Sequence, residues 1–205
     1  MTLKIYGNMR SSTFRVVWAA EELGLSYELY ELEVEDCSKD KELALLNPNR
    51  KIPVIEDGDV VLWESMAINL HLARKSGGEL APKDEIEDAQ MQMWSFWVSS
   101  ECILDCMTVL AHSVLMPEDE RSTEALEAAL HRLGRPLEVL NNHLEITGFV
   151  INARFTIADL NIASVIGWLA EASIDLAAYP NILAWIERCS DRSAAKKCIA
   201  MAAGV

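Results

Sequence analysis

The hydrophobic residues in the first half of the chain change their period several times, from the alternation typical of strands to the spacing typical of helices. We predict strands over four segments, namely Leu3–Tyr6, Tyr27–Leu32, Val54–Glu56 and Val60–Trp63. We predict helices over three more, namely Ser12–Leu23, a short one that Ser38 caps and that ends at Leu45, and Ser65–Lys75. The order β-α-β-α-β-β-α matches a thioredoxin-like fold, whose first two strands should be parallel.

The second half of the chain has the helical spacing throughout. We predict helices over the segments 85 to about 114, 122 to about 146, 157 to about 170, 181–189 and 192 to about 200. Pro136 should kink or break the second of these. The box Thr156-Ile157-Ala158-Asp159 should cap the third, which is almost entirely apolar and is therefore expected to be buried. The chain is thus predicted to be α/β plus all-α: a thioredoxin-like domain over 1–78, a linker over 79–84 and an all-helical domain over 85–205.

The composition is that of a globular protein. The chain has 205 residues, 51% of them hydrophobic, which is enough for a large core. A formal charge of −14 argues against nucleic acid as a partner, because phosphates need a basic surface. The apolar stretches are too short for a membrane span, and residues 1–6 lack the apolar run of a signal peptide, so we expect a cytoplasmic protein with no membrane partner. The five cysteines are expected to be reduced thiols, and the four scattered histidines indicate no metal site.

The positive charges are unevenly placed in this acidic chain. Arg10 and Arg15 are the only charged residues between positions 7 and 20, and Arg50 and Lys51 are the only ones between positions 43 and 55. If the two segments meet in space, they would form a basic pocket for a small anion. The alternative is that four surface cations happen to lie in acid-poor stretches.

The stretch from Asn47 to Gly58, followed by Glu64-Ser65, carries the most information about function. Pro53 lies where strand pairing would begin and cannot donate a backbone hydrogen bond. A cis bond before it would turn the N–H and C=O of Ile52 outward, toward an extended peptide-like ligand. Glu64 and Ser65 would lie at a helix N-terminus, where carboxylates bind well. Together these features predict a site that holds a small peptide by its backbone.

This pattern resembles the cytosolic glutathione transferases, whose motifs here are Asn47-Pro48, Lys51-Ile52-Pro53 and Glu64-Ser65-Met66-Ala67-Ile68. Arg50 departs from the family, which usually has Gly at this position. The capping box at 156–159 extends the resemblance over essentially the whole chain. The resemblance implies a detoxifying enzyme that conjugates the thiolate of glutathione to a small, hydrophobic electrophile. It also implies a homodimer, glutathione as co-substrate and no permanently bound cofactor.

The resemblance assigns roles to individual residues. Anchored on Arg15, it makes Ser11 the hydroxyl that stabilises the thiolate, with its neighbour Ser12 as the alternative. Tyr6 lies too close to Arg15 for this role and is expected to be a core residue of its strand. The remaining contacts with glutathione are assigned to Lys51 for the glycyl carboxylate, Ile52 and Pro53 for the cysteinyl unit, and Glu64 and Ser65 for the γ-glutamyl end.

The second substrate and the reaction class each have more than one candidate. Candidates for the pocket that takes the electrophile are Trp94, Trp97, Met107 and His112, although such a stripe is more often part of a core. A glutathione-dependent isomerase or dehalogenase would use the same glutathione site. A related but non-catalytic interaction module is the third possibility, and intact Ser11, Glu64 and Ser65 argue against it.

Overall fold

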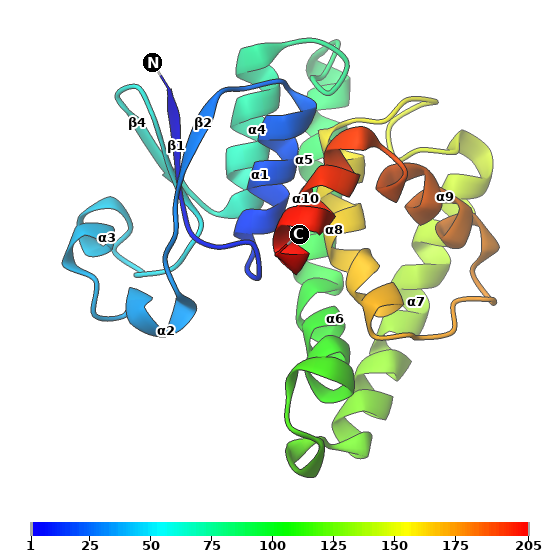
Figure 1. The fold of residues 1–205 in the computed structure, drawn as a ribbon. Helices are drawn as coiled ribbons and strands as arrows, with labels where there is room; N and C mark the ends of the chain where they lie inside the picture. Colours follow the sequence, from blue (N-terminus) through cyan, green and yellow to red (C-terminus); the bar gives the residue numbers. More distant parts are fainter. Residues whose placement is uncertain (1, 205) are drawn as a thin grey trace. The chain divides into compact units, whose positions relative to one another are not determined.

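The computed structural model describes residues 2–204, and contacts within the chain divide it into two units. The first unit contains Met1–Pro82 and Asp191–Val205, and the second contains Lys83–Ser190. In Figure 1 the first unit comprises the blue and cyan segments together with the red C-terminal helix. The C-terminal segment therefore packs with the N-terminal half of the sequence.

A four-stranded mixed sheet forms the centre of the first unit. Its strands are β1 (Leu3–Tyr6), β2 (Tyr27–Tyr30), β3 (Val54–Asp57) and β4 (Val60–Trp63), in the spatial order β2-β1-β3-β4. β1 runs parallel to β2, while β3 is antiparallel to both of its neighbours. Gly58 (φ 67°) lies in the two-residue turn that joins β3 to β4, so the predicted hairpin is confirmed. The predicted thioredoxin-like arrangement is confirmed as well.

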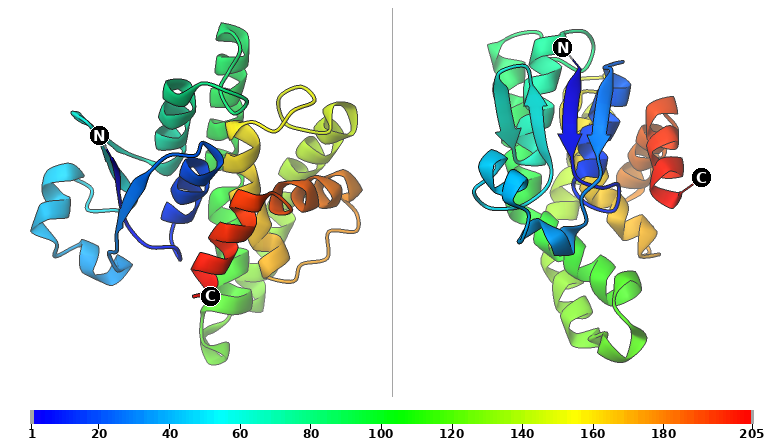
Figure 2. Two further views of the ribbon diagram at one scale, coloured as in Figure 1. Left: turned by 45° about the horizontal axis from the view of Figure 1, so that its top comes forward. Right: turned by 60° about the vertical axis from the view of Figure 1, so that its left-hand side comes forward.

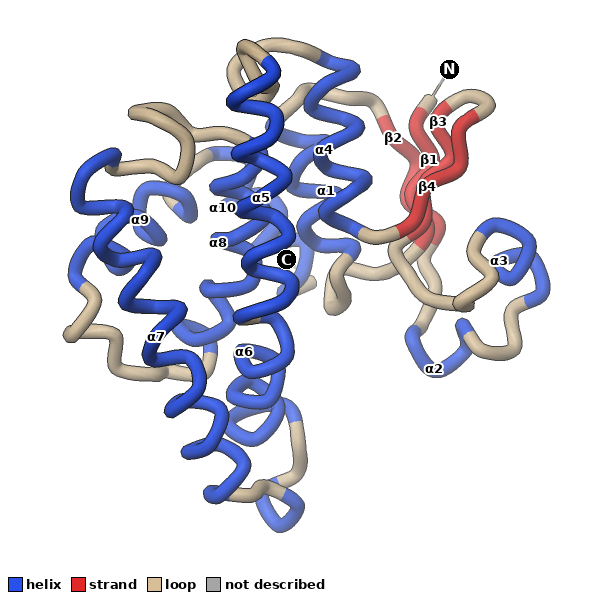
Figure 3. Tube along the Cα trace, turned by 180° about the vertical axis from the view of Figure 1, so that it is seen from behind, coloured by secondary structure: helices blue, strands red, loops and turns tan. Residues whose placement is uncertain are grey.

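Three helices of the first unit pack together, and two of them cover one face of the sheet. They are α1 (Thr13–Glu22), α4 (Ser65–Ser76) and α10 (Ser193–Ala203). Figure 3 shows α1 and α4 side by side next to the strands. Val16 and Ile68 on these helices are fully buried together with Ile5 and Ile55, which pair between β1 and β3. α10 packs against α1, where Arg192 donates two hydrogen bonds of 2.7 Å to the carboxylate of Glu22.

The other face of the sheet carries a small cluster with two short helices, α2 (Val34–Cys37) and α3 (Lys41–Leu46). In the left-hand view of Figure 2 both lie to the left of the strands, on the side away from α1. Cys37, Leu43 and Val54 form the cluster, with Tyr6 packed against it. The prediction of one helix capped by Ser38 is wrong. Asp40 caps α3 by accepting a 2.8 Å hydrogen bond from the Leu43 N–H, a role for which a carboxylate is as well suited as a hydroxyl.

The second unit is helical, as predicted. Its elements are α5 (Glu85–Glu101), α6 (Ile103–Leu110), a π-helical turn (Ala111–Leu115), a 3-10 turn (Glu118–Glu120), α7 (Thr123–Thr147), α8 (Ile157–Glu171) and α9 (Pro180–Ser190). α7 continues through the buried Pro136 and is not broken there.

The prediction of one continuous helix from 85 to 114 is wrong, because the chain bends by 47° between α5 and the helical segment that follows. The bend occurs at Cys102 (φ −122°, ψ −39°). Just before it, the Ser100 hydroxyl donates a 3.3 Å hydrogen bond to the Trp97 carbonyl. Serine and threonine hydroxyls that bond back to the preceding turn often bend a helix.

The capping box at the start of α8 is confirmed. The fully buried carboxylate of Asp159 accepts hydrogen bonds from the N–H groups of Thr156 (2.9 Å) and Val150 (2.8 Å) and from the indole of Trp185 (2.9 Å). Burial nevertheless raises the pKa of Asp159, since these bonds only partly offset the loss of water. This one side chain thus connects α8 to the preceding loop and to α9.

Within residues 2–204, no single helix has both the length and the apolar character to cross a membrane. The bent pair formed by Glu85–Glu101 and Ile103–Leu115 has that length and composition only when its two helices are taken together.

Candidate glutathione site

The loop between β1 and α1 has a defined shape because Asn8 braces it. The buried Asn8 donates through Nδ2 to the Leu32 carbonyl (2.7 Å) and accepts through Oδ1 from the Arg10 N–H (3.1 Å). Its own carbonyl accepts the N–H of Ser11 at 3.2 Å. Asn8 therefore ties the residues before α1 to the end of β2.

The two candidate serines lie in different environments. The Ser11 hydroxyl donates to the Asn8 carbonyl (2.8 Å), lies 2.8 Å from the Thr13 hydroxyl and accepts the Thr13 N–H at 3.1 Å. Ser12 is the N-cap residue of α1, and its side chain makes no capping hydrogen bond. Both are partly buried. Since the first turn of α1 has no acidic residue, the positive end of the helix dipole is not neutralised there.

Gly7, Thr13 and Ile52 are in close contact, and this joins the Ser11 loop to the loop that carries the Pro53 motif. A Cβ added at Gly7 would lie 2.0 Å from Thr13 Oγ1 and 3.2 Å from Ile52 Cβ. Gly7 also has a φ of 145°, which side chains rarely adopt. Glycine at this position therefore allows the two loops to meet.

The loop before β3 is held by another buried asparagine, Asn47. Its Nδ2 donates to the Lys51 carbonyl (2.7 Å), and its own carbonyl accepts the Arg50 N–H at 2.9 Å. Arg50 adopts a φ of 53°, the left-handed conformation that glycine favours, although the resemblance would place Gly there. The loop thus keeps a conformation suited to glycine without the glycine.

The Ile52–Pro53 bond is cis. Within residues 2–204 the backbone N–H and C=O of Ile52 have no hydrogen-bond partner. An extended ligand could pair with both groups. Lys51 next to them is exposed.

The start of α4 is the third part of the site. Glu64, its N-cap, has φ 71° and ψ 104°, a backbone conformation that costs a residue other than glycine about 1–3 kcal/mol. Ser65 is buried, and its hydroxyl accepts a 2.9 Å hydrogen bond from Nη1 of Arg15. Asn69 on the next turn of α4 donates to the Arg15 carbonyl at 3.1 Å. Arg15 therefore holds α1 and the beginning of α4 together.

The four positively charged residues that lie in acid-poor stretches of the sequence differ in burial and do not form one basic pocket. Arg15 is fully buried, and burial lowers its pKa to about 10, so it still carries its charge at neutral pH. Arg10, Arg50 and Lys51 are exposed. The buried charge beside Ser65 gives this end of the site a fixed positive potential.

Comparison with known proteins is consistent with this geometry. The family model for the glutathione S-transferase N-terminal domain matches residues 1–74, and that for the C-terminal domain matches residues 103–193. The probable glutathione S-transferase GSTF2 of Oryza sativa subsp. japonica is 30% identical over 198 residues, which cover 89% of each chain. The chain belongs to the glutathione S-transferase family. Glutathione S-transferase GstB of Escherichia coli strain K12 is 26% identical over 94% of each chain.

Solved structures of glutathione S-transferases share the whole fold. The theta class enzyme of Xanthomonas axonopodis pv. citri, solved with glutathione bound, is 30% identical with a TM-score of 0.88 and covers 96% of each chain. Glutathione S-transferase-I bound with lactoylglutathione is 27% identical with a TM-score of 0.88, over 98% of this chain and 99% of that one. The predicted family, fold class and enzyme class are therefore confirmed, with glutathione as the co-substrate.

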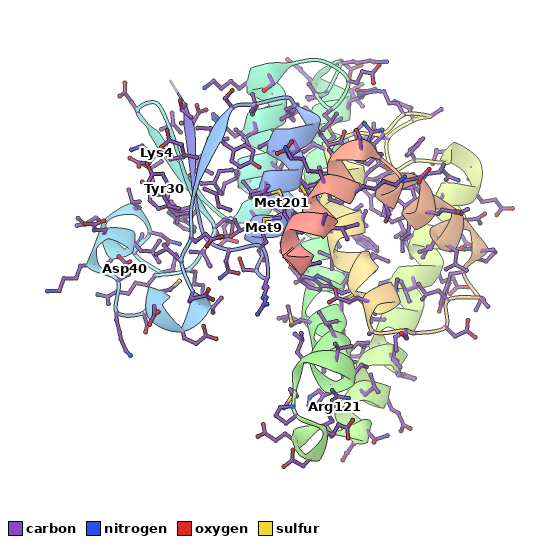
Figure 4. The ribbon with its side chains drawn as sticks, viewed as in Figure 1. Lys4, Met9, Tyr30, Asp40, Arg121 and Met201 are labelled. Atoms are coloured by element: carbon purple, nitrogen blue, oxygen red, sulfur yellow. The ribbon has the colours of Figure 1, made fainter. Side chains whose placement is uncertain are left out.

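The geometry also bears on Tyr6, since some glutathione transferases use a tyrosine. The Tyr6 hydroxyl donates to the carboxylate of Glu56, and its ring stacks on Tyr30 with centroids 4.9 Å apart. Burial and the neighbouring Glu56 raise the pKa of Tyr6. Figure 4 labels Tyr30 and Lys4 on the sheet and Met9 on the loop before α1. Because its hydroxyl already donates a hydrogen bond to Glu56, Tyr6 is a poor donor to a sulfur.

Sequence reasoning missed the residues that position the site. The buried polar residues Asn8, Thr13 and Asn69 have no predicted role, Asn47 enters only as part of the Asn47-Pro48 motif, and Arg15 is grouped with three cations that are exposed. One signal was available for Arg15, which lies in the sequence between the hydrophobic residues Phe14 and Val16 of the predicted helix. A charged residue in an apolar stretch is rarely buried unless it has a specific partner. No comparable signal marks the asparagines.

The candidates for the electrophile pocket lie in the second unit. Trp94 is buried, with its ring 5.0 Å from that of Trp97 and 4.7 Å from that of His143. Nδ1 of His112 accepts the N–H of Ser122 at 3.1 Å. Trp97 lines an open cavity of about 310 Å³ and Met107 lines another of about 560 Å³. Trp97 and Met107 therefore remain predicted contacts, whereas Trp94 and His112 have structural partners.

The cysteines and histidines within residues 2–204 form neither a disulfide nor a metal-binding cluster. All five cysteines are free and buried, and burial raises the pKa of Cys102 to about 12. In the part of the chain that the structure describes, no group of three or more His, Cys, Asp or Glu residues is arranged to hold a metal ion.

Proposed function

We propose that this glutathione transferase conjugates glutathione to a small, hydrophobic electrophile, with Ser11 as the residue that stabilises the thiolate. The reaction is attack of the glutathione sulfur on an electrophilic carbon, and the thiolate is the nucleophile. A hydrogen bond to a charged group contributes about 1.5–3 kcal/mol. That corresponds to one or two pKa units for the thiol, at about 1.4 kcal/mol for each unit.

One observation carries this proposal: three segments far apart in the sequence meet around one point. Thr13 is hydrogen-bonded to Ser11 and lies against Gly7 beside Ile52. Arg15, two residues further along α1, binds Ser65 at the start of α4. A peptide paired with Ile52 would thus reach the hydroxyl of Ser11 on one side and the N-terminus of α4 on the other.

We assign the contacts with glutathione accordingly. Ile52 pairs through its unpartnered N–H and C=O with the cysteinyl unit, and Pro53 holds that loop in its cis conformation. Glu64 binds the γ-glutamyl ammonium, while Ser65 binds the adjacent carboxylate near the buried charge of Arg15. The exposed Lys51 reaches the glycyl carboxylate.

Two alanine variants decide whether Ser11 or Ser12 stabilises the thiolate. Ser11→Ala should lower turnover of a chloronitrobenzene about 10- to 100-fold while the Kd for glutathione stays nearly unchanged, because the lost bond acts on the thiolate. Ser12→Ala is the matched control and should retain activity. If Ser12→Ala loses turnover and Ser11→Ala does not, the assignment is off by one residue. Failure of the wild-type protein to bind glutathione-agarose would contradict the enzymatic proposal and favour an interaction module.

We also propose that the protein is a cytoplasmic homodimer. Large apolar side chains are exposed on each unit: Val60, Val61 and Trp63 on β4, and Met93 and Phe96 on α5. Phe96 is 68% exposed, and a contact with a second subunit would remove it from water. Sedimentation should show a dimer for the wild type and a weaker dimer for Phe96→Glu. A monomeric wild type would contradict the proposal.

A further inference from the structure

The Ser11 hydroxyl is surrounded by more hydrogen-bonding groups than a single donor to sulfur needs. A hydroxyl has one proton to donate and two lone pairs that accept. Here the Asn8 carbonyl lies 2.8 Å away, the Thr13 hydroxyl 2.8 Å and the Thr13 N–H 3.1 Å. All three positions around Ser11 Oγ are thus occupied.

The direction of each bond follows from the chemistry of the partners. A carbonyl can only accept, so Ser11 donates its single proton to Asn8. The Thr13 hydroxyl must then donate to Ser11, because Ser11 has no second proton. Ser11 therefore accepts two hydrogen bonds from Thr13, one from its backbone and one from its side chain.

We propose that Thr13 is a positioning residue for the reaction, whose hydroxyl donates to Ser11 and makes it a stronger donor to the glutathione sulfur. This inference rests on the proposed role of Ser11. When glutathione binds, the sulfur replaces the Asn8 carbonyl as the acceptor of the Ser11 proton. That carbonyl still accepts the Ser11 N–H at 3.2 Å, so it is not left without a partner. The two bonds from Thr13 remain.

The strengthening has a physical basis and a size. A hydroxyl that accepts hydrogen bonds is polarised and donates more strongly, by about 10–30% for each bond in condensed phases. Ser11 accepts two such bonds in a site that is partly buried. The hydrogen bond from Ser11 to the sulfur lowers the pKa of the glutathione thiol by about one to two units. Without the Thr13 hydroxyl, this lowering would be smaller by about 0.1–0.6 unit.

The surroundings hold the Thr13 hydroxyl in this direction. Thr13 is fully buried at the first position of α1. Its Oγ1 occupies the space where a Cβ at Gly7 would lie, 2.0 Å from that point. Its side chain is therefore confined between Gly7 and Ser11, and this space is open because Gly7 has no Cβ.

The test compares Thr13→Val with Thr13→Ser. Valine keeps the branched shape and removes the hydroxyl, while serine keeps the hydroxyl and removes a methyl group. The pKa of glutathione bound to each variant is read from the ultraviolet absorbance of the thiolate during a pH titration. We expect Thr13→Val to raise this pKa by about 0.5 unit and to lower kcat about threefold below the pKa, with an unchanged KM for glutathione. Thr13→Ser should titrate as the wild type does.

Two results would overturn the inference: a Thr13→Val titration that coincides with the wild type, or an equal shift in Thr13→Ser. Should Thr13→Val fail to fold, Thr13→Ala carries the same expectation. A structure of the wild type with glutathione gives a test without variants. There Thr13 Oγ1 should stay within hydrogen-bonding distance of Ser11 Oγ while the bond from Ser11 to the Asn8 carbonyl opens, and a lost contact between Thr13 and Ser11 would contradict the inference.

Ser11→Ala separates this inference from the proposed function. If Ser11→Ala raises the pKa of bound glutathione and Thr13→Val does not, only the role of Thr13 fails. If Ser11→Ala leaves that pKa unchanged, the proposed role of Ser11 fails and the inference fails with it.

Discussion

The backbone of Glu64 predicts a change that stabilises the protein and weakens its binding of glutathione. At φ 71° and ψ 104°, a residue with a side chain is strained by about 1–3 kcal/mol. Glycine would not be strained, but its greater freedom in the unfolded chain costs about 0.4–1 kcal/mol. Glu64→Gly should therefore gain about 1 kcal/mol of stability, which raises Tm by about 2–4 °C in a chain of this size.

The same substitution removes the proposed partner of the glutathione ammonium. Losing a hydrogen bond to a charged group costs about 1.5–3 kcal/mol, so the Kd for glutathione should rise about 10- to 150-fold. Glu64→Gln is the matched control, because it keeps the strained backbone and removes the charge. It should bind glutathione more weakly without any gain in Tm.

Thermal unfolding followed by circular dichroism and titration calorimetry with glutathione measure the two effects. If Glu64→Gly is less stable than Glu64→Gln, the strain argument is wrong. If Glu64→Gln binds glutathione as tightly as the wild type, the role assigned to the Glu64 carboxylate is wrong.

Three further predictions concern the carboxylates of Asp159 and Asp57 and the hydroxyl of Tyr6. Asp159→Ala should lower the free energy of unfolding in urea by at least about 3 kcal/mol, since it leaves several buried donors unpaired at about 1–3 kcal/mol each; a loss below about 1 kcal/mol would contradict this. Burial raises the pKa of Asp57, but hydrogen bonds from Lys75 and His71 outweigh burial and hold that pKa below its usual range. The ionised Asp57 therefore stabilises the folded protein above the pKa that it has in the unfolded chain. This stabilisation is lost as the pH falls through the pKa that Asp57 has in the folded protein. Lys75→Met should therefore lower Tm at neutral pH and leave it unchanged well below about pH 4, and a difference that persists in acid would argue against the pairing. Tyr6→Phe should keep kcat/KM within about twofold, whereas a loss above about tenfold would make Tyr6 a second candidate donor.

Much of the fold could be predicted because local signals agreed with tertiary packing. The hairpin at Asp57-Gly58-Asp59 and the box from Thr156 to Asp159 each combine turn or capping chemistry with a change of hydrophobic period. The errors arose where one weak signal stood alone. The bend at Cys102 has neither Gly nor Pro to mark it. The cap of α3 is Asp40, two residues after the predicted Ser38, and both residue types cap well.

The candidate site could be predicted only in part. The motif residues Ile52, Glu64 and Ser65 have chemistry that is visible in the sequence, and the structure brings their segments together with Ser11. The residues that hold these segments act through contacts across large sequence separations. Arg15 binds Ser65, fifty positions away, and no local pattern predicts which buried polar side chain will find such a partner.

The central claim is that the loop ending at Ser11, the loop at Ile52 and the start of α4 hold glutathione with its sulfur at Ser11. A crystal structure of the protein with glutathione tests it most directly. The sulfur should lie within hydrogen-bonding distance of Ser11 Oγ, and the cysteinyl backbone should pair with the N–H and C=O of Ile52. A tripeptide bound elsewhere, or one whose sulfur contacts neither Ser11 nor Ser12, would contradict the claim.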